Sequence, residues 1–129
     1  MFSAAVTEHF MAAHSLKGEA FGPAQGTHGA TYVVTAEFKS PTITSDNIVI
    51  DIGTAQQLLK TTVAPLHFKN LDTLPQFDGC NTTTEFLAQH IHGELTKHLD
   101  GSFEGILRIR IDETHLAWVT YEAPVGAKR

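Results

Sequence analysis

The stretch ATYVVTAEF, residues 30–38, alternates between two sets of side chains along its whole length. Successive side chains of a β-strand point to opposite faces, so this alternation predicts a strand with one buried face. The residues expected on the buried face are Ala30, Tyr32, Val34, Ala36 and Phe38. The opposite face would carry Val33, Thr35 and Glu37.

Outward from this strand, the chain predicts three more strands and two helices. Apolar residues recur at helical spacing over 53–65, and Thr82-x-x-Glu85 has the spacing of a capping box that opens a second helix. Gly and Pro punctuate the segments between the periodic stretches. The other strands are expected over 6–14, 106–111 and 116–122.

The predicted order is therefore β-β-α-α-β-β. It indicates the α+β class, in which two helices pack on one face of an antiparallel sheet. A length of 129 residues suits one domain with one core, so we expect residues 1–129 to form a single domain.

Composition excludes several classes of function. The net charge is -5 with nine Lys and Arg residues, which is not the pattern of a nucleic-acid or membrane-surface protein. No apolar stretch is long enough to cross a bilayer. The first ten residues lack a basic leader and contain Glu8, and Cys80 is the only cysteine, so we expect a cytoplasmic protein.

Two ionisable residues follow the strand expected at 106–111. If the strand continues, Glu113 and His115 share the face of Leu107, Ile109 and Ile111. A buried carboxylate needs a partner, so such a pair would indicate a ligand site. If the strand instead ends near Asp112, both side chains are simply hydrated.

Two histidines flank the loop over 17–26. His14 ends one predicted strand and His28 begins the next, so a hairpin would bring the imidazoles together. Zinc needs at least three protein ligands, and the alternative is two unrelated histidines at strand ends. The chain has no phosphate-binding loop, CxxC pair, nucleophile elbow or HExxH motif.

Five segments, taken together, resemble the 6-pyruvoyl-tetrahydropterin synthase and 6-carboxy-tetrahydropterin synthase family. Their order and spacing match over nearly the whole chain, in the manner of a divergent bacterial homologue. The segments are FMAAHSL (10–16), FGPAQGTHGATY (21–32), LHFKNLD (66–72), TTTEFLA (82–88) and IDETHLAWVTYE (111–122).

The resemblance implies a tunnelling fold, usually assembled as a hexamer with active sites between subunits. It also implies a zinc-dependent lyase whose metal is held by three histidines. Of these, His14 and His28 match, whereas the third position holds Ala30. Glu113 matches the residue that anchors the pterin ring. Thr83 and Thr84 match residues that seat it alongside Glu85, for which capping the helix is a competing role.

The departures from the family concern its catalytic groups. Ala24 occupies the place of the catalytic cysteine, and His67 and Phe68 replace the catalytic Asp-His pair. The resemblance implies that the standard synthase reaction eliminates triphosphate and needs a general base. Loss of a positioned base lowers rates by about 10²–10⁴-fold, so we expect little of this standard activity.

We therefore expect a protein that binds a pterin or a related purine-derived heterocycle. The expected zinc ligands are His14, His28 and His115, with His67 as the second candidate for the missing ligand. His115 or His67 would otherwise supply acid–base catalysis without a metal. The alternative from another class is a non-catalytic binding or scaffold member that keeps the fold and the ring anchor.

Overall fold

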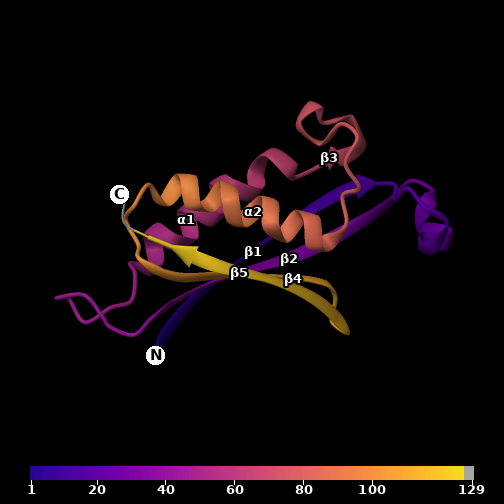
Figure 1. Cartoon of the computed structure of the whole chain (residues 1–129). Coiled ribbons are helices and arrows are strands. Elements are labelled where there is room, and N and C mark those ends of the chain that lie inside the picture. Colours follow the sequence, from indigo (N-terminus) through magenta and orange to yellow (C-terminus); the bar gives the residue numbers. More distant parts are fainter. Residues whose placement is uncertain (127–129) are drawn as a thin grey trace.

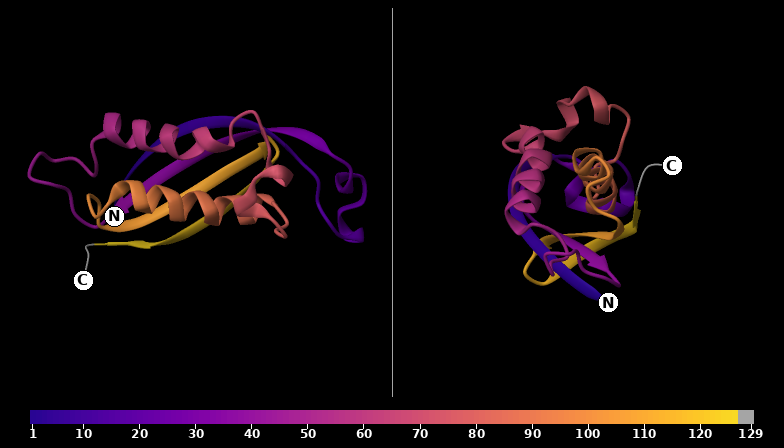
Figure 2. Two further views of the ribbon diagram at one scale, coloured as in Figure 1. Left: turned by 90° about the horizontal axis from the view of Figure 1, so that it is seen from above. Right: turned by 90° about the vertical axis from the view of Figure 1, so that its left-hand side faces the viewer.

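The computed structural model describes residues 1–126 and confirms the α+β class (Figure 1). A five-stranded sheet carries both α-helices on one face, and the end-on view of Figure 2 shows these two layers. The elements are β1 (Phe2–His14), β2 (His28–Ser40), α1 (Ile52–Val63), β3 (Lys69–Asn70), α2 (Thr84–Leu99), β4 (Gly105–Thr114) and β5 (Ala117–Val125).

The strands lie in the order β3-β1-β2-β4-β5, and all pairs are antiparallel except β1 with β3. β1 and β2 form a long hairpin whose register runs from Phe2 opposite Ser40 to His14 opposite His28. The predicted strands are all present, and each is longer than the sequence pattern indicated. The two-residue strand β3 was not predicted, because it pairs through backbone groups alone and has no side-chain period to recognise.

The core lies between the sheet and the two helices. α1 packs mainly against β1, and α2 packs against β4 and β5. The alternation predicted for β2 is confirmed, since its even-numbered residues from Tyr32 to Phe38 are buried. Large side chains with almost no exposure include Phe10, Phe38, Leu59, Leu87, Leu107 and Ile109. Burial of such apolar surface is the dominant favourable term in folding.

Side chains at the two helix starts supply the hydrogen bonds that the first turn lacks. The Asp51 carboxylate accepts from the N–H of Thr54, and the Thr83 hydroxyl accepts from the N–H of Phe86. The predicted capping box is therefore wrong, because Thr83 and not Thr82 caps α2, and the residue three positions after Thr83 is Phe86 and not a glutamate. Thr82 is left free to contact β1.

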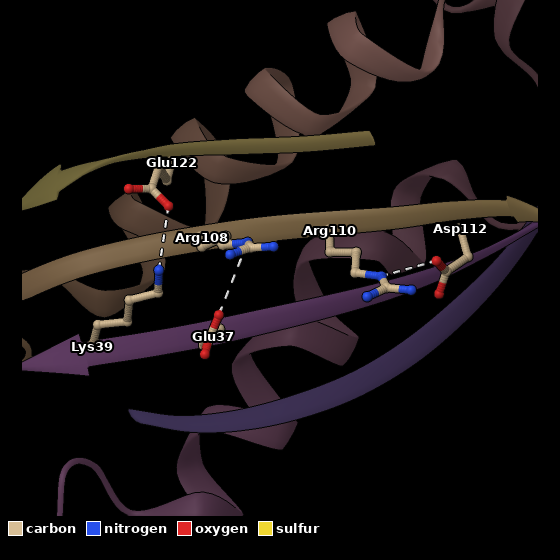
Figure 3. A network of polar contacts seen from close by, with 6 residues as sticks. All are labelled: Glu37, Lys39, Arg108, Arg110, Asp112 and Glu122. Atoms are coloured by element: carbon tan, nitrogen blue, oxygen red, sulfur yellow. Dashed lines mark hydrogen bonds and ion pairs between the residues drawn. The ribbon is translucent and has the colours of Figure 1, made fainter. Parts of the chain in front are cut away.

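The open face of the sheet is polar and balanced in charge (Figure 3). Three ion pairs lie on it: Lys39–Glu122 at 3.4 Å and Arg108–Glu37 at 3.9 Å join different strands, and Arg110–Asp112 at 3.0 Å lies within β4. The Arg110 guanidinium also lies 4.1 Å from the centre of the Trp118 ring. Solvent-exposed ion pairs contribute at most about 1 kcal/mol each, so the opposite face and its core hold the fold together. No helix within residues 1–126 is long and apolar enough to cross a membrane.

We predict opposite effects for one substitution at two glycines. A Cβ at Gly105 would lie 2.2 Å from the carbonyl oxygen of Lys39, whereas one at Gly93, in the exposed middle of α2, would meet nothing within 4 Å. Gly105→Ala should lower the free energy of unfolding by about 1–3 kcal/mol through overpacking. Gly93→Ala should raise it by about 0.5–1 kcal/mol through helix propensity. Urea denaturation measures both, and equal shifts of the same sign would contradict the close approach of β4 to β2.

Candidate functional site

A pocket of about 630 Å³ opens at the end of the sheet opposite the two chain termini. β1 and β4 end there, and β2 and α2 begin there. The polar side chains that line it are His14, His28, Thr31, Tyr32, Thr83, Thr84, Glu85, Glu113 and Thr114. The structure thus brings together the predicted His14, His28, Thr83, Thr84, Glu85 and Glu113, which come from four separate segments of the chain.

The hairpin register determines the relation between the two histidines. His14 lies directly opposite His28, and their ring centres are 4.6 Å apart. His14 is buried at 4% exposure, whereas His28 is half-buried. Burial lowers the pKa of His14 below its usual value, and the proximity of His28 lowers it further. His14 is therefore held as a neutral imidazole near neutral pH.

Hydroxyl groups contact both ring nitrogens of His14. Its Nδ1 lies 2.9 Å from the Thr82 hydroxyl, and its Nε2 lies 3.2 Å from the Tyr32 hydroxyl. Burial, and next the nearby charge of Glu113, raise the pKa of Tyr32 to about 12. The Tyr32 hydroxyl consequently keeps its proton at neutral pH and can donate it in a hydrogen bond.

His28 makes a different contact. Its Nδ1 lies 2.9 Å from the carbonyl oxygen of Gly26. A carbonyl only accepts hydrogen bonds, so Nδ1 carries a proton and Nε2 of the neutral ring holds the lone pair. Such a contact fixes the tautomer and the orientation of a histidine ring.

Glu113 lies at an irregularity in the ladder between β4 and β5. Asp112 pairs with Trp118 and Thr114 pairs with Ala117, which leaves Glu113 as the extra residue of a β-bulge. The Thr84 hydroxyl at the start of α2 donates a hydrogen bond to Glu113 Oε1. β4 therefore continues past Asp112, although Glu113 and His115 are both exposed in the single chain.

Two other predicted residues lie outside the pocket. His115 belongs to the turn between β4 and β5 and lines a neighbouring hollow with Arg110 and Glu113. The bulge breaks the two-residue period from which a common face for Glu113 and His115 was expected. His67 lies beside His9, and its Nδ1 accepts a hydrogen bond from the N–H of Met11. This contact satisfies a backbone donor of β1.

The residues present do not make a complete zinc site within this chain. His14 and His28 supply two imidazoles, and Ala30 lies on their face of β2 with no metal-binding atom. Among residues 1–126, no group of three or more His, Cys, Asp or Glu side chains is arranged to hold a metal ion. The expected set of His14, His28 and His115 is thus not assembled, because the turn carries His115 away from the hairpin.

Tyr32 and Thr82 belong to the site but were not identified as site residues from the sequence. Tyr32 was assigned to the buried face of its strand, and it is indeed 2% exposed. The available signal was its position two residues beyond Ala30 on the strand that begins with His28, since that spacing gives a common face. Thr82 gave no signal, because its contact with His14 depends on where α2 begins.

Comparisons with known proteins agree with this architecture. The family model of 6-pyruvoyl tetrahydropterin synthase matches residues 3–124. No curated protein sequence matches the chain.

Solved structures with the same fold include two synthases. The Caenorhabditis elegans 6-pyruvoyl tetrahydropterin synthase is similar with a TM-score of 0.83 at 20% identity, over 95% of each chain. The Plasmodium vivax enzyme of the same name gives a TM-score of 0.75 at 15% identity, over 97% of this chain and 100% of the other. At these identities the structures establish the tunnelling fold, and the family model over residues 3–124 establishes the family. The chain belongs to the 6-pyruvoyl tetrahydropterin synthase family.

Proposed function

We propose that the chain binds the ring of a pterin or a related purine-derived heterocycle in the pocket at the start of α2. The observation that carries this proposal is the position of Glu113 beside the α2 N-terminus, within a pocket of about 630 Å³. That volume lies in the usual range for sites that bind small molecules.

Glu113 suits the pyrimidine edge of such a ring. The two oxygens of an ionised carboxylate can accept paired hydrogen bonds from adjacent N–H and amino groups. The Thr84 hydroxyl donates to Oε1 and so orients the carboxylate. Thr83 and Glu85 complete this side of the pocket, where N–H groups of the first helical turn have no partner within the helix.

The charge of the pocket favours a ligand without phosphates. Within residues 1–126, no Lys or Arg side chain lines the pocket, and Glu85 and Glu113 contribute two carboxylates. Arg and Lys side chains are the usual partners of phosphate groups, and the N–H groups at the start of α2 share their side of the pocket with Glu85 and Glu113. A neutral heterocycle is therefore a better match to this wall than a triphosphate ester.

Two candidates remain for what happens to the bound ring. The first is a lyase-type enzyme with altered catalytic residues. The second is a non-catalytic binding member, and it is favoured by Ala24, which lines the pocket where the resemblance places a catalytic cysteine. It is also favoured by the use of His67 as a hydrogen-bond partner for β1. Both candidates share the ring anchor.

We further propose that the protein acts as a hexamer. In the described sheet β5 is paired on one side only, and the nearby Leu116 and Trp118 are 79% and 51% exposed. A long open edge invites pairing with another chain, and closure of sheets into a barrel removes it. Joining of sheets would place the pocket, which lies at the sheet end, close to a neighbouring subunit.

The ring anchor is tested by Glu113→Gln. The amide presents a donor where the ring also donates, so neopterin affinity should fall about 10–100-fold, the value of one or two charged hydrogen bonds. Isothermal titration calorimetry measures this. Glu122→Gln on the open sheet face is the matched control and should bind neopterin like the parent. Equal affinities for all three proteins would contradict the assignment of Glu113.

The catalytic state is tested with dihydroneopterin triphosphate. Because no thiol stands at position 24, we expect standard turnover at least about 10²–10⁴-fold below that of a family synthase assayed in parallel. Quantitative chromatography of the product measures the rate. Turnover equal to that of the synthase would refute the expectation. Any residual turnover that disappears in His115→Ala or His67→Ala would assign a replacement acid or base and select the lyase candidate.

The assembly is tested by size-exclusion chromatography with light scattering. We expect a mass of about six chains that does not change on tenfold dilution, because joined sheet edges form an obligate interface. A stable monomer at micromolar concentration would rule the hexamer out.

A further inference from the structure

We propose that His14 serves this pocket as the hydrogen-bonded partner of Tyr32 and not as a metal ligand, so that the chain holds no zinc here. A single substitution, Ala30→His, would then be enough to create a zinc site. This inference concerns the metal alone and goes beyond the proposed binding of a heterocycle.

Both ring nitrogens of His14 already have hydrogen-bond partners. A neutral imidazole has one N–H and one ring nitrogen with a lone pair. The Thr82 hydroxyl is 2.9 Å from Nδ1 and the Tyr32 hydroxyl is 3.2 Å from Nε2. Whichever tautomer His14 adopts, a hydroxyl group contacts the nitrogen that carries the lone pair. A metal could bind His14 only by displacing one of these buried hydrogen bonds.

The pocket offers too few ligands for a metal ion in the part of the chain that the structure describes. His28 presents Nε2, because its Nδ1–H is directed to the Gly26 carbonyl. Glu85 and Glu113 also line the pocket, but within residues 1–126 no three His, Cys, Asp or Glu side chains converge on one point to hold a metal. Of the two imidazoles, only His28 thus offers a ring nitrogen without a hydrogen-bond partner, whereas zinc requires at least three protein ligands.

Position 30 lies where a third imidazole would face the same pocket. Residues 28, 30 and 32 lie on one face of β2, and His14 pairs with His28 across the hairpin. Ala30 is half-buried and lines the pocket, so a larger side chain has room there. An imidazole at position 30 would lie on the same sheet face as His14 and His28. Three imidazole ligands would then come from neighbouring positions of the hairpin.

The experiment measures bound zinc after saturation with zinc chloride and gel filtration, using inductively coupled plasma mass spectrometry. The wild-type protein and Tyr32→Phe should each retain less than about a tenth of an ion per chain, and Ala30→His about one ion per chain, because three ligands are then present. The matched control is a histidine on the opposite face of β2. Thr31 itself lines the pocket, so Thr35, further along the same face of β2, is the position used: Thr35→His adds an imidazole outside the pocket and should behave like the wild type.

A double variant tests the role of Tyr32 separately. In Ala30→His/Tyr32→Phe, zinc no longer has to displace the Tyr32 hydroxyl, so its affinity should rise about fivefold over Ala30→His, the value of one hydrogen bond. Competition with a chromogenic zinc chelator measures this difference. Unchanged affinity would show that Tyr32 does not compete with the metal.

About one zinc ion per chain in the wild-type protein would overturn the inference, including the case in which a neighbouring subunit supplies the third ligand. Failure of folded Ala30→His to take up zinc would overturn the geometry proposed for position 30. If Ala30→His does not fold, as judged by circular dichroism, the wild-type zinc content still decides between the two roles of His14. Neopterin binding is a separate measurement, so a zinc-containing wild type that binds neopterin would refute this inference and leave the proposed function standing.

Discussion

The antiparallel register between β1 and β2 is the constraint on which the rest of the structure depends. A strand alternates faces with a period of two, so a slip of one residue would turn every inward side chain toward solvent. The observed register places Phe10, Tyr32 and Phe38 in the core. It also places His14 opposite His28. The same hydrogen-bonded ladder thus determines both the packing of the core and the polar groups at its end.

The remaining parts of the pocket depend on two local irregularities. The bulge at Glu113 interrupts the ladder between β4 and β5, and bulges commonly redirect side chains next to binding sites. The start of α2 meets this bulge through the hydrogen bond from Thr84 to Glu113. The regular hairpin therefore supplies His14, His28 and Tyr32, and the bulge and the start of α2 supply the carboxylate and hydroxyl groups on the other side of the pocket.

Most of the fold could be predicted from the sequence, because the alternation over 30–38 and the helical spacings are strong periodic signals. The segments that resemble the family correctly brought His14, His28, Thr84 and Glu113 to one place. The position of His115 could not be predicted, since a strict two-residue period takes no account of a bulge. The roles of Thr82 and Tyr32 were missed for a related reason. Each depends on a contact between segments that are far apart in the sequence, and not on a local pattern.

The ion pairs on the open sheet face have a consequence for how a ligand approaches the molecule. Three of the nine Lys and Arg side chains, Lys39, Arg108 and Arg110, are held there beside carboxylates, and none of these three lines the pocket. Glu85 and Glu113 are the acidic side chains that line the pocket, Arg110 in the neighbouring hollow is paired with Asp112, and a cleft lined by charge of one sign focuses its field outward. A diffusing polyanion is repelled by such a field, whereas a neutral ring is not. For the proposed heterocycle, such a field would act on the rate of encounter, before any contact is made.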